Sequence, residues 1–113
     1  MKVLFICNQN ENRSKTAETI FKNRKGWKVK SAGLYNENPV TKEQIEWADL
    51  IMVMEDQQRK EIAERFPKEY LQKRIISLDI QDRYSFGDKE LIDLLKKKVD
   101  KLLKELILED LQA

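Results

Sequence analysis

Runs of apolar residues separated by polar stretches predict four strands along this chain. Val3–Cys7 is a continuous apolar run, as expected for a strand buried on both faces of a sheet, and Leu50–Met54 repeats the pattern. Trp27–Ala32 alternates with lysines, which favours a half-exposed strand at an edge. Arg74–Leu78 is predicted to be the fourth strand.

Helical patterns separate these strands. Apolar residues recur at helical spacing from Ala17 to Phe21, and we expect Gly26 to end that helix. Thr41 and Gln44 have the spacing of a capping box, which predicts a short helix ending near Trp47.

The second half of the chain predicts two further helices. Asp56–Phe66 is expected to be helical until Pro67 stops it. From Asp88 onward the chain is predicted to form one long amphipathic helix that packs on the sheet rather than forming a coiled-coil dimer seam. Its apolar side is formed by Leu91, Leu94, Leu95, Val99, Leu102, Leu103, Leu106 and Leu111.

This alternation of strands and helices indicates an α/β fold with a parallel sheet and right-handed crossovers. Ligands of such sheets bind beyond the carboxyl ends of the strands. Cys7 ends the first strand, and Asp79 and Asp82 follow the last one. We therefore expect a thiol and a carboxylate to meet at one rim of the sheet.

Length and composition bound the function. The 113 residues are expected to form a single domain, 1–113, and a net charge of +2 favours no nucleic acid partner. The local basic stretch between Lys22 and Lys30 is interpreted as a solvated helix end and edge strand. No run of ~18 apolar residues and no signal peptide is present, so we expect no membrane association and a cytoplasmic protein.

The chain contains one cysteine and no histidine. A disulfide framework is therefore excluded, a structural zinc site is not expected, and neither a metal nor another cofactor is predicted. Serine–histidine and cysteine–histidine hydrolase mechanisms are excluded as well. Any activation of the thiol has to come from its loop, a helix N-terminus or a guanidinium group.

Cys7 is followed six residues later by Arg13 and Ser14, where a helix begins. Helix N-termini and guanidinium groups favour the thiolate form of a cysteine. The loop residues between them could surround a phosphate with backbone N–H groups, and Arg13 could hold two of its oxygens. The expected phosphate-binding residues are Asn8, Gln9, Asn10, Glu11, Asn12, Arg13 and Ser14.

This segment resembles the start of the low-molecular-weight protein tyrosine phosphatases, which carry a Cys-x5-Arg-Ser loop with an asparagine in its middle, here Asn10. The likeness continues, in the family's order, through most of the chain. It includes Ala17-Glu18 on the following helix, Ser31-Ala32-Gly33, Ala48 to Glu55, and Asp82-Arg83-Tyr84, which resembles the family's Asp-Pro-Tyr loop. The expected fold is a three-layer αβα sandwich with a four-stranded parallel sheet in the order 2-1-3-4.

The resemblance implies a cysteine-dependent phosphatase that hydrolyses phosphotyrosine-type phosphomonoesters through a phosphocysteine intermediate. Cys7 would be the nucleophile, Arg13 the stabilising cation and Asp82 the general acid, with Asp79 as an alternative acid. Tyr84 would lie at the substrate rim. The expected partner is a phosphorylated protein or a small phosphomonoester, and the chain is expected to be a monomer or weak dimer.

Several residues depart from the family pattern. Gln9 replaces a glycine, Asn12 replaces a second cysteine of many members, and Glu11 places a carboxylate in an anion-binding loop. Glu11 raises phosphoarginine as a variant substrate, because a carboxylate can pair with a guanidinium group. The alternatives are a catalytically weak phosphate- or phosphopeptide-binding module and an arsenate reductase that uses external thiols. A phosphocysteine carrier of the sugar-transport type would not need Arg13 or Asp82 where they stand.

Overall fold

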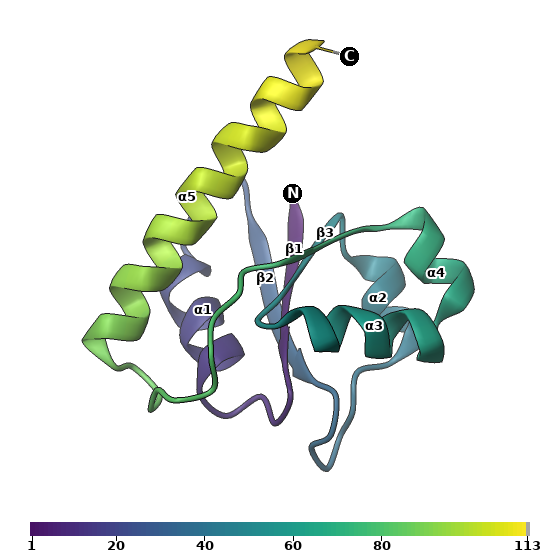
Figure 1. Ribbon diagram of the computed structural model, residues 1–113, viewed down its shortest axis with the longest axis horizontal. Coiled ribbons are helices and arrows are strands. Elements are labelled where there is room, and N and C mark those ends of the chain that lie inside the picture. The colour runs from purple at the N-terminus through teal and green to yellow at the C-terminus, as the bar shows by residue number, and fades with distance from the viewer. Residues whose placement is uncertain (113) are drawn as a thin grey trace.

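The computed structural model describes residues 1–112 (Figure 1). Its elements are β1 (Lys2–Cys7), α1 (Arg13–Phe21), β2 (Lys28–Gly33), α2 (Lys42–Trp47), β3 (Leu50–Val53), α3 (Asp56–Arg65), α4 (Pro67–Gln72), β4 (Arg74–Ser77) and α5 (Lys89–Gln112). All strand pairs are parallel, and the sheet has the order β2-β1-β3-β4. The predicted fold class and strand order are confirmed.

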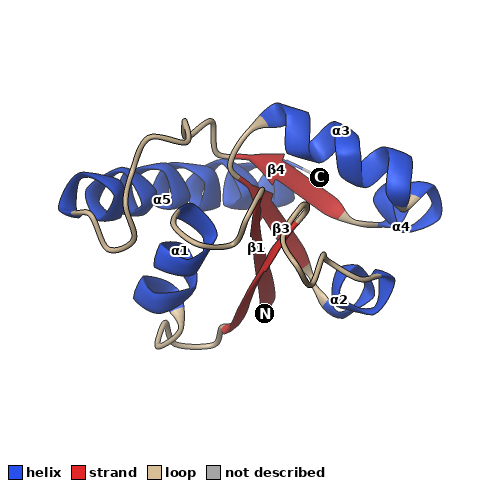
Figure 2. Ribbon diagram, turned by 90° about the horizontal axis from the view of Figure 1, so that it is seen from below, coloured by secondary structure: helices blue, strands red, loops and turns tan. Residues whose placement is uncertain are grey.

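Helices cover both faces of the sheet and create two apolar cores. One core lies beneath α1 and α5, and contains Phe5 and Met52 from the central strands. The other lies beneath α2 and α3, and contains Ile6 and Ile51. Figure 2 shows α1 and α5 on one side of the strands and α2, α3 and α4 on the other. The central strands are therefore buried on both faces, as their continuous apolar runs predict.

Local sequence signals account for most element ends. The hydroxyl of Thr41 accepts the Gln44 N–H at 3.2 Å, and the Gln44 side chain accepts the Thr41 N–H at 2.9 Å, so the predicted capping box is present. The long helix begins at Lys89, where the Asp88 carboxylate accepts the Glu90 N–H at 2.9 Å.

Three sequence expectations are wrong in detail. The first helix ends at Phe21 rather than at Gly26, which instead occupies the left-handed region (φ 81°) of the turn before β2. Pro67 does stop α3, but it also opens the unpredicted helix α4, because proline is well accommodated at the first helical position. Leu111 is 78% exposed and does not pack on the sheet.

Candidate active site

Cys7 lies at the carboxyl end of β1, directly before a loop that leads into α1. Its side chain is buried, and the backbone N–H of Asn10 points at its sulfur with an N···Sγ distance of 3.2 Å. Asn10 makes this possible by adopting a left-handed conformation (φ 57°), which asparagine tolerates better than most residues. The loop therefore curls around the sulfur instead of extending away from it.

Ser14 connects the sulfur to the loop. Its Oγ lies 2.9 Å from the Sγ of Cys7 and 2.7 Å from the Oδ1 of Asn10. The hydroxyl has one proton, so when it donates to Asn10 the thiol has to donate to Ser14. A thiolate reverses this order: Ser14 donates to the sulfur, and the amide of Asn10 presents its NH₂ group to Ser14. The same three side chains can thus serve both protonation states.

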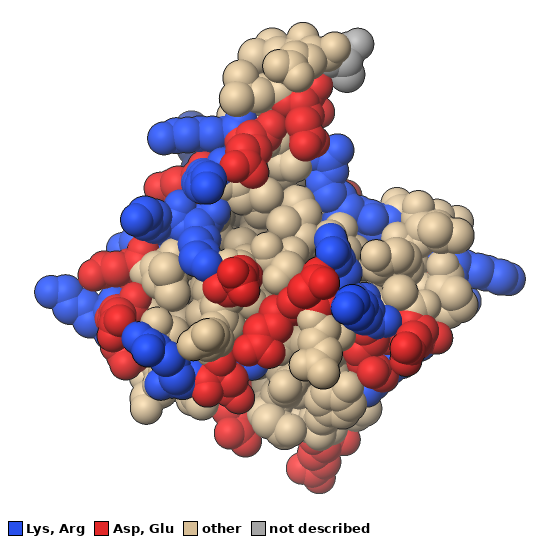
Figure 3. Space-filling view, viewed as in Figure 1, with Lys and Arg blue, Asp and Glu red and all other residues tan. Residues whose placement is uncertain are grey.

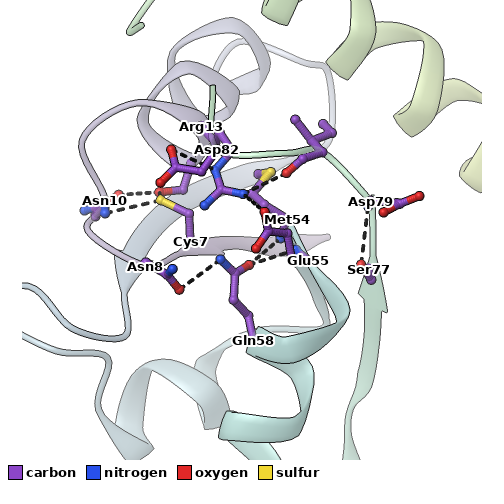
Figure 4. Close-up of polar contacts among 12 residues, drawn as sticks. Cys7, Asn8, Asn10, Arg13, Met54, Glu55, Gln58, Ser77, Asp79 and Asp82 are labelled. Carbon is purple, nitrogen blue, oxygen red and sulfur yellow. Dashed lines mark hydrogen bonds and ion pairs between the residues drawn. The ribbon is translucent and has the colours of Figure 1, made fainter. Parts of the chain in front are cut away.

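Arg13 is buried and held by three groups from two segments, the one that follows β3 and the one that follows β4. Its Nη1 donates to the carbonyl of Ile80 at 2.7 Å and lies 3.0 Å from a carboxylate oxygen of Glu55. Its Nε lies 3.7 Å from a carboxylate oxygen of Asp82, whose side chain is 59% exposed. The guanidinium group is therefore fixed in one orientation at the base of the loop (Figure 4).

A small pocket brings the expected catalytic residues together. It is lined by Cys7, Gln9, Glu11, Asn12, Arg13 and Asp82. The first strand supplies the thiol, the start of α1 supplies the guanidinium group, and the segment after β4 supplies the carboxylate. The rim of the sheet predicted from the strand order is the place where they meet.

Asp79 lies elsewhere. It follows β4 in a left-handed conformation (φ 55°), and its carbonyl accepts a hydrogen bond from Lys98 at 2.6 Å. In Figure 4 its side chain is directed away from Cys7, whereas Asp82 lies beside Arg13. Of the two candidate acids, only Asp82 lines the pocket.

The segment carrying Asp82 is tied to the start of α1. The Phe86 N–H donates to the side-chain oxygen of Asn12 at 3.1 Å, and the Gly87 N–H donates to the Thr16 hydroxyl at 3.0 Å. Asn12 therefore anchors the segment that carries Asp82. This arrangement holds the two ends of the pocket at a fixed separation.

The aromatic residues of this loop take different positions. Tyr84 is half-buried against the core beneath α5, with the Arg83 guanidinium 5.1 Å from its ring centre, and it is not among the residues lining the pocket. Phe86 is 55% exposed next to Asn12. The sequence analysis expects Tyr84 at the substrate rim, but the exposed aromatic ring beside Asn12 is that of Phe86.

Gln58 braces the loop from the opposite side. Its side-chain oxygen accepts the N–H groups of Met54 and Glu55, at 2.8 and 2.9 Å, and its Nε2 donates to the side-chain oxygen of Asn8 at 3.1 Å. Gln58 is buried, and it links the start of α3 to the start of the loop. Its position three residues after Glu55 was the available sequence signal.

Gly33 allows the end of β2 to approach the loop. The Asn8 carbonyl accepts the N–H groups of Leu34 and Tyr35, each at 2.9 Å. A Cβ at Gly33 would lie 2.9 Å from that carbonyl and 2.8 Å from the Asn36 side chain. A glycine is therefore required by close backbone approach at this position.

Tyr35 forms a second polar group beside the loop, together with two residues of α3. The Arg65 guanidinium lies 5.0 Å from the Tyr35 ring centre and its Nε donates to Glu61 at 2.6 Å. Partial desolvation, together with a hydrogen bond to Glu61, raises the pKa of Tyr35. The hydrogen bond from Arg65, reinforced by the one from Tyr35, lowers the pKa of Glu61.

The site carries more negative than positive charge. Glu11, Glu55 and Asp82 surround the single guanidinium group of Arg13. Within residues 1–112, no cluster of three or more histidine, cysteine, aspartate or glutamate side chains has the arrangement of a metal site. Nor is any helix in this part of the chain long and apolar enough to cross a membrane.

Comparisons with known proteins show a similar N-terminal sequence and a similar fold. Residues 2–46 match the family model described as low molecular weight phosphotyrosine protein phosphatase. The comparison with curated proteins found no match.

Solved structures resemble the whole chain. The YwlE arginine phosphatase from Geobacillus stearothermophilus is 23% identical, with 98% of this chain and 96% of that chain covered and a TM-score of 0.76. A low molecular weight protein tyrosine phosphatase from Bacillus subtilis is 25% identical, covering 93% and 98% of the two chains with a TM-score of 0.73. The tyrosine phosphatase Wzb from Escherichia coli K30, solved with phosphate, is 20% identical over 93% and 97%, with a TM-score of 0.74.

The fold and the N-terminal loop are therefore similar to those of phosphatases that carry a cysteine in this loop. The resemblance stated from the sequence is confirmed: the chain has the fold and the N-terminal loop sequence of the low-molecular-weight protein tyrosine phosphatases, which are hydrolases.

Proposed function

We propose that this protein is a cysteine-dependent phosphatase that hydrolyses phosphomonoesters of the phosphotyrosine type through a phosphocysteine intermediate. The observation that carries the proposal is that one pocket is lined by Cys7, Arg13 and Asp82. These three groups supply a nucleophile, a cation for the transferred phosphoryl group and an acid for the leaving group.

In the first step, the Cys7 thiolate attacks phosphorus and the bond to the ester oxygen breaks. Asp82, in its protonated form, gives its proton to the departing oxygen, so the leaving group departs as a neutral alcohol or phenol. The Asn10 N–H and the Ser14 hydroxyl reduce the charge on the attacking sulfur, and Arg13 stabilises the equatorial oxygens.

In the second step, the Asp82 carboxylate takes a proton from water as the water oxygen attacks phosphorus. The phosphorus–sulfur bond breaks, phosphate leaves and the thiolate is restored. This cycle needs neither a metal nor a second cysteine. Its substrates would be phosphorylated proteins or small phosphomonoesters.

Phosphoarginine is a second candidate substrate, and a specific observation favours it. Glu11 lines the same pocket as Asp82, so two carboxylates stand where the substrate's leaving group would lie. These carboxylates repel an anionic substrate surface and attract a guanidinium group, which can donate two parallel hydrogen bonds to one carboxylate. One neighbour of the same fold is itself an arginine phosphatase.

The first experiment is phosphate release from para-nitrophenyl phosphate by the wild type, Cys7→Ser and Asp82→Ala, with vanadate as inhibitor. The proposal predicts loss of turnover in Cys7→Ser, strong reduction in Asp82→Ala and inhibition by vanadate. A folded wild type that binds phosphopeptides without turnover would instead indicate a binding module. Arsenate reduction supported by added thiols, without phosphatase activity, would indicate a reductase.

Substrate choice is tested by comparing phosphotyrosine and phosphoarginine peptides of the same sequence in the wild type and Glu11→Gln. If Glu11 recognises a guanidinium group, the variant loses activity on phosphoarginine and keeps or gains activity on phosphotyrosine. Equal changes on the two peptides would refute this role of Glu11.

A further inference from the structure

Helix α5 is longer than the sheet that it covers. Its 24 residues span about 36 Å, whereas the strands have four to six residues and extend roughly 13–20 Å. The last turns consequently project beyond the sheet (Figure 1). Three large apolar side chains are exposed there: Ile107 at 59%, Leu108 at 56% and Leu111 at 78%.

A groove runs between α5 and the edge strand β4. Its apolar surface comes from Ile76, Leu78, Leu94 and Leu102. β4 is at the end of the strand order, so no further strand of residues 1–112 covers this side. The space-filling view shows uncharged surface between α5 and the sheet, with basic side chains along the helix (Figure 3).

On the side of α5 that faces this groove, basic residues come first along the helix and acidic residues follow. Lys97, Lys98 and Lys101 line the groove at the level of the sheet. One to two turns later the same side carries Glu105, which also lines the groove, and Glu109, which lies 3.3 Å from Arg74 of β4. Leu108 lies between these two glutamates, because positions 105, 108 and 109 share a helix face. The helix face is therefore basic in one half and acidic and apolar in the other.

We propose that this face is a dimerisation surface, and that the groove of one copy is occupied by the end of α5 from a second copy in antiparallel orientation. An antiparallel pair about a two-fold axis at the level of Leu103 places position 101 beside position 105 of the other copy, and position 97 beside position 109. Each copy then contributes two lysines and two glutamates, and all four contacts pair opposite charges. This is the self-complementarity that an isologous interface requires.

The same register accounts for two of the three exposed apolar residues, Leu108 and Leu111. Leu111 of one copy comes opposite position 95 of the other, one residue away from Leu94 in the apolar part of the groove. Leu108 comes beside the aliphatic stem of Lys98, which can cover an apolar neighbour while its ammonium group stays bound to the Asp79 carbonyl. The apolar contacts provide the affinity, and the charge pattern selects the antiparallel register over a parallel one.

A second copy suits the groove better than an unrelated partner. The helix that supplies the lysines of the groove also carries the glutamates and the exposed leucines that would bind there. A parallel pair would set lysines against lysines and glutamates against glutamates. None of the residues that line the groove lines the catalytic pocket, so the surface is free to associate while the pocket functions.

The experiment is sedimentation velocity of the full chain from low micromolar to near-millimolar concentration. The weight-average mass is expected to rise from the monomer mass of 13.5 kDa toward twice that value. Leu111→Asp removes an exposed contact without touching the core, and it is expected to keep the chain monomeric throughout this range. A wild type that stays monomeric at the highest concentration would overturn the proposal.

A charge exchange tests the register itself. Lys97→Glu/Lys101→Glu and Glu105→Lys/Glu109→Lys are each expected to weaken self-association at least tenfold, because each homodimer would oppose like charges. An equimolar mixture of the two variants restores every pair with opposite charges, so it should form a heterodimer at least as tight as the wild-type dimer. Circular dichroism shows that each variant is folded. Failure of the mixture to associate, with the wild type dimeric and both variants folded, would overturn the antiparallel register.

Discussion

The sulfur of Cys7 lies 2.9 Å from the hydroxyl oxygen of Ser14, the residue that follows the pocket's arginine. Ser14 is fully buried, and the side-chain oxygen of Asn10, 2.7 Å away, is the other partner of its hydroxyl. The Asn10 N–H donates to the sulfur, and the Ser14 hydroxyl can become a second donor when the Asn10 amide presents its NH₂ group to Ser14. The loop is thus built to hold negative charge on sulfur without a histidine.

Ser14→Ala tests this relationship. The variant removes one donor to the thiolate, and a hydrogen bond to a charged group is worth roughly 1.5–3 kcal/mol. We expect alkylation of Cys7 by iodoacetamide at neutral pH to slow roughly tenfold, since 1.4 kcal/mol corresponds to a factor of ten. Ser14→Thr, which keeps the hydroxyl, is the control. An alkylation rate unchanged in Ser14→Ala would show that the hydroxyl is not a donor to the sulfur.

Asp82→Asn separates the two candidate acids. Loss of a positioned general acid typically costs 10²–10⁴-fold, so turnover of phenyl phosphate should fall by about two orders of magnitude. For a substrate with a good leaving group, the rate of the first step should fall less, because that group needs no proton to depart. Asp79→Asn is the matched control, because asparagine also tolerates the left-handed backbone found there, and it should retain near-wild-type turnover. The reverse ranking of the two variants would assign the acid role to Asp79.

Glu55→Gln removes the carboxylate nearest to Arg13. The guanidinium group is buried, and the loss of a charge partner leaves it poorly compensated, so we expect a lower melting temperature. Added phosphate should narrow the difference from the wild type, because the bound anion replaces the missing charge. Thermal unfolding with and without phosphate measures both effects. A difference that phosphate leaves unchanged would mean that Glu55 acts through α3 rather than through Arg13.

Gly33→Ala tests the close approach of β2 to the loop. The added methyl group would lie within 3 Å of the Asn8 carbonyl and the Asn36 side chain, so we expect a destabilisation of about 1–3 kcal/mol. Urea unfolding measures it. Ala32→Ser at the neighbouring position is the control for a small change in the same strand. A Gly33→Ala protein as stable as the wild type would contradict the geometry described for this contact.

Glu61 makes stability depend on pH in a defined direction. Its pKa is lowered in the folded state by Arg65 and Tyr35, so its contribution is present above the unfolded pKa of ~4.3 and is lost as pH falls through the folded value. We expect Glu61→Gln to be less stable than the wild type at neutral pH and equally stable in acid. Urea unfolding at the two pH values tests this. A stability difference that grows toward acid would contradict the ion pair.

Much of the fold follows from the hydrophobic pattern. The continuous apolar runs in β1 and β3 and the lysine-spaced run in β2 distinguish buried from edge strands, since one side of an edge strand faces water. The helix opened by Pro67 was missed because proline was interpreted only as a terminator. Leu111 was assigned to the core because its spacing fits the apolar side of α5, and the pattern does not reveal where the sheet ends.

The part of the site that lies within one stretch of the sequence could be predicted. Cys7 and Arg13 lie in one loop, and their spacing indicates the pocket. The roles of Glu55 and Gln58 depend on the distance between β3 and the loop, which only the folded chain sets. The choice between Asp79 and Asp82 depends on a left-handed residue after β4, and sequence alone gave no sign of that turn.

The most direct test of the central claim is to trap the intermediate. Asp82→Ala, which retains the thiol but lacks the group that activates water, is mixed with para-nitrophenyl phosphate, quenched and analysed by intact and peptide mass spectrometry. The account predicts one added phosphoryl group, located on the peptide that contains Cys7, and none in Cys7→Ser/Asp82→Ala. Turnover by the wild type, with no phosphoryl group on Cys7 at any quench time, would contradict the phosphocysteine mechanism.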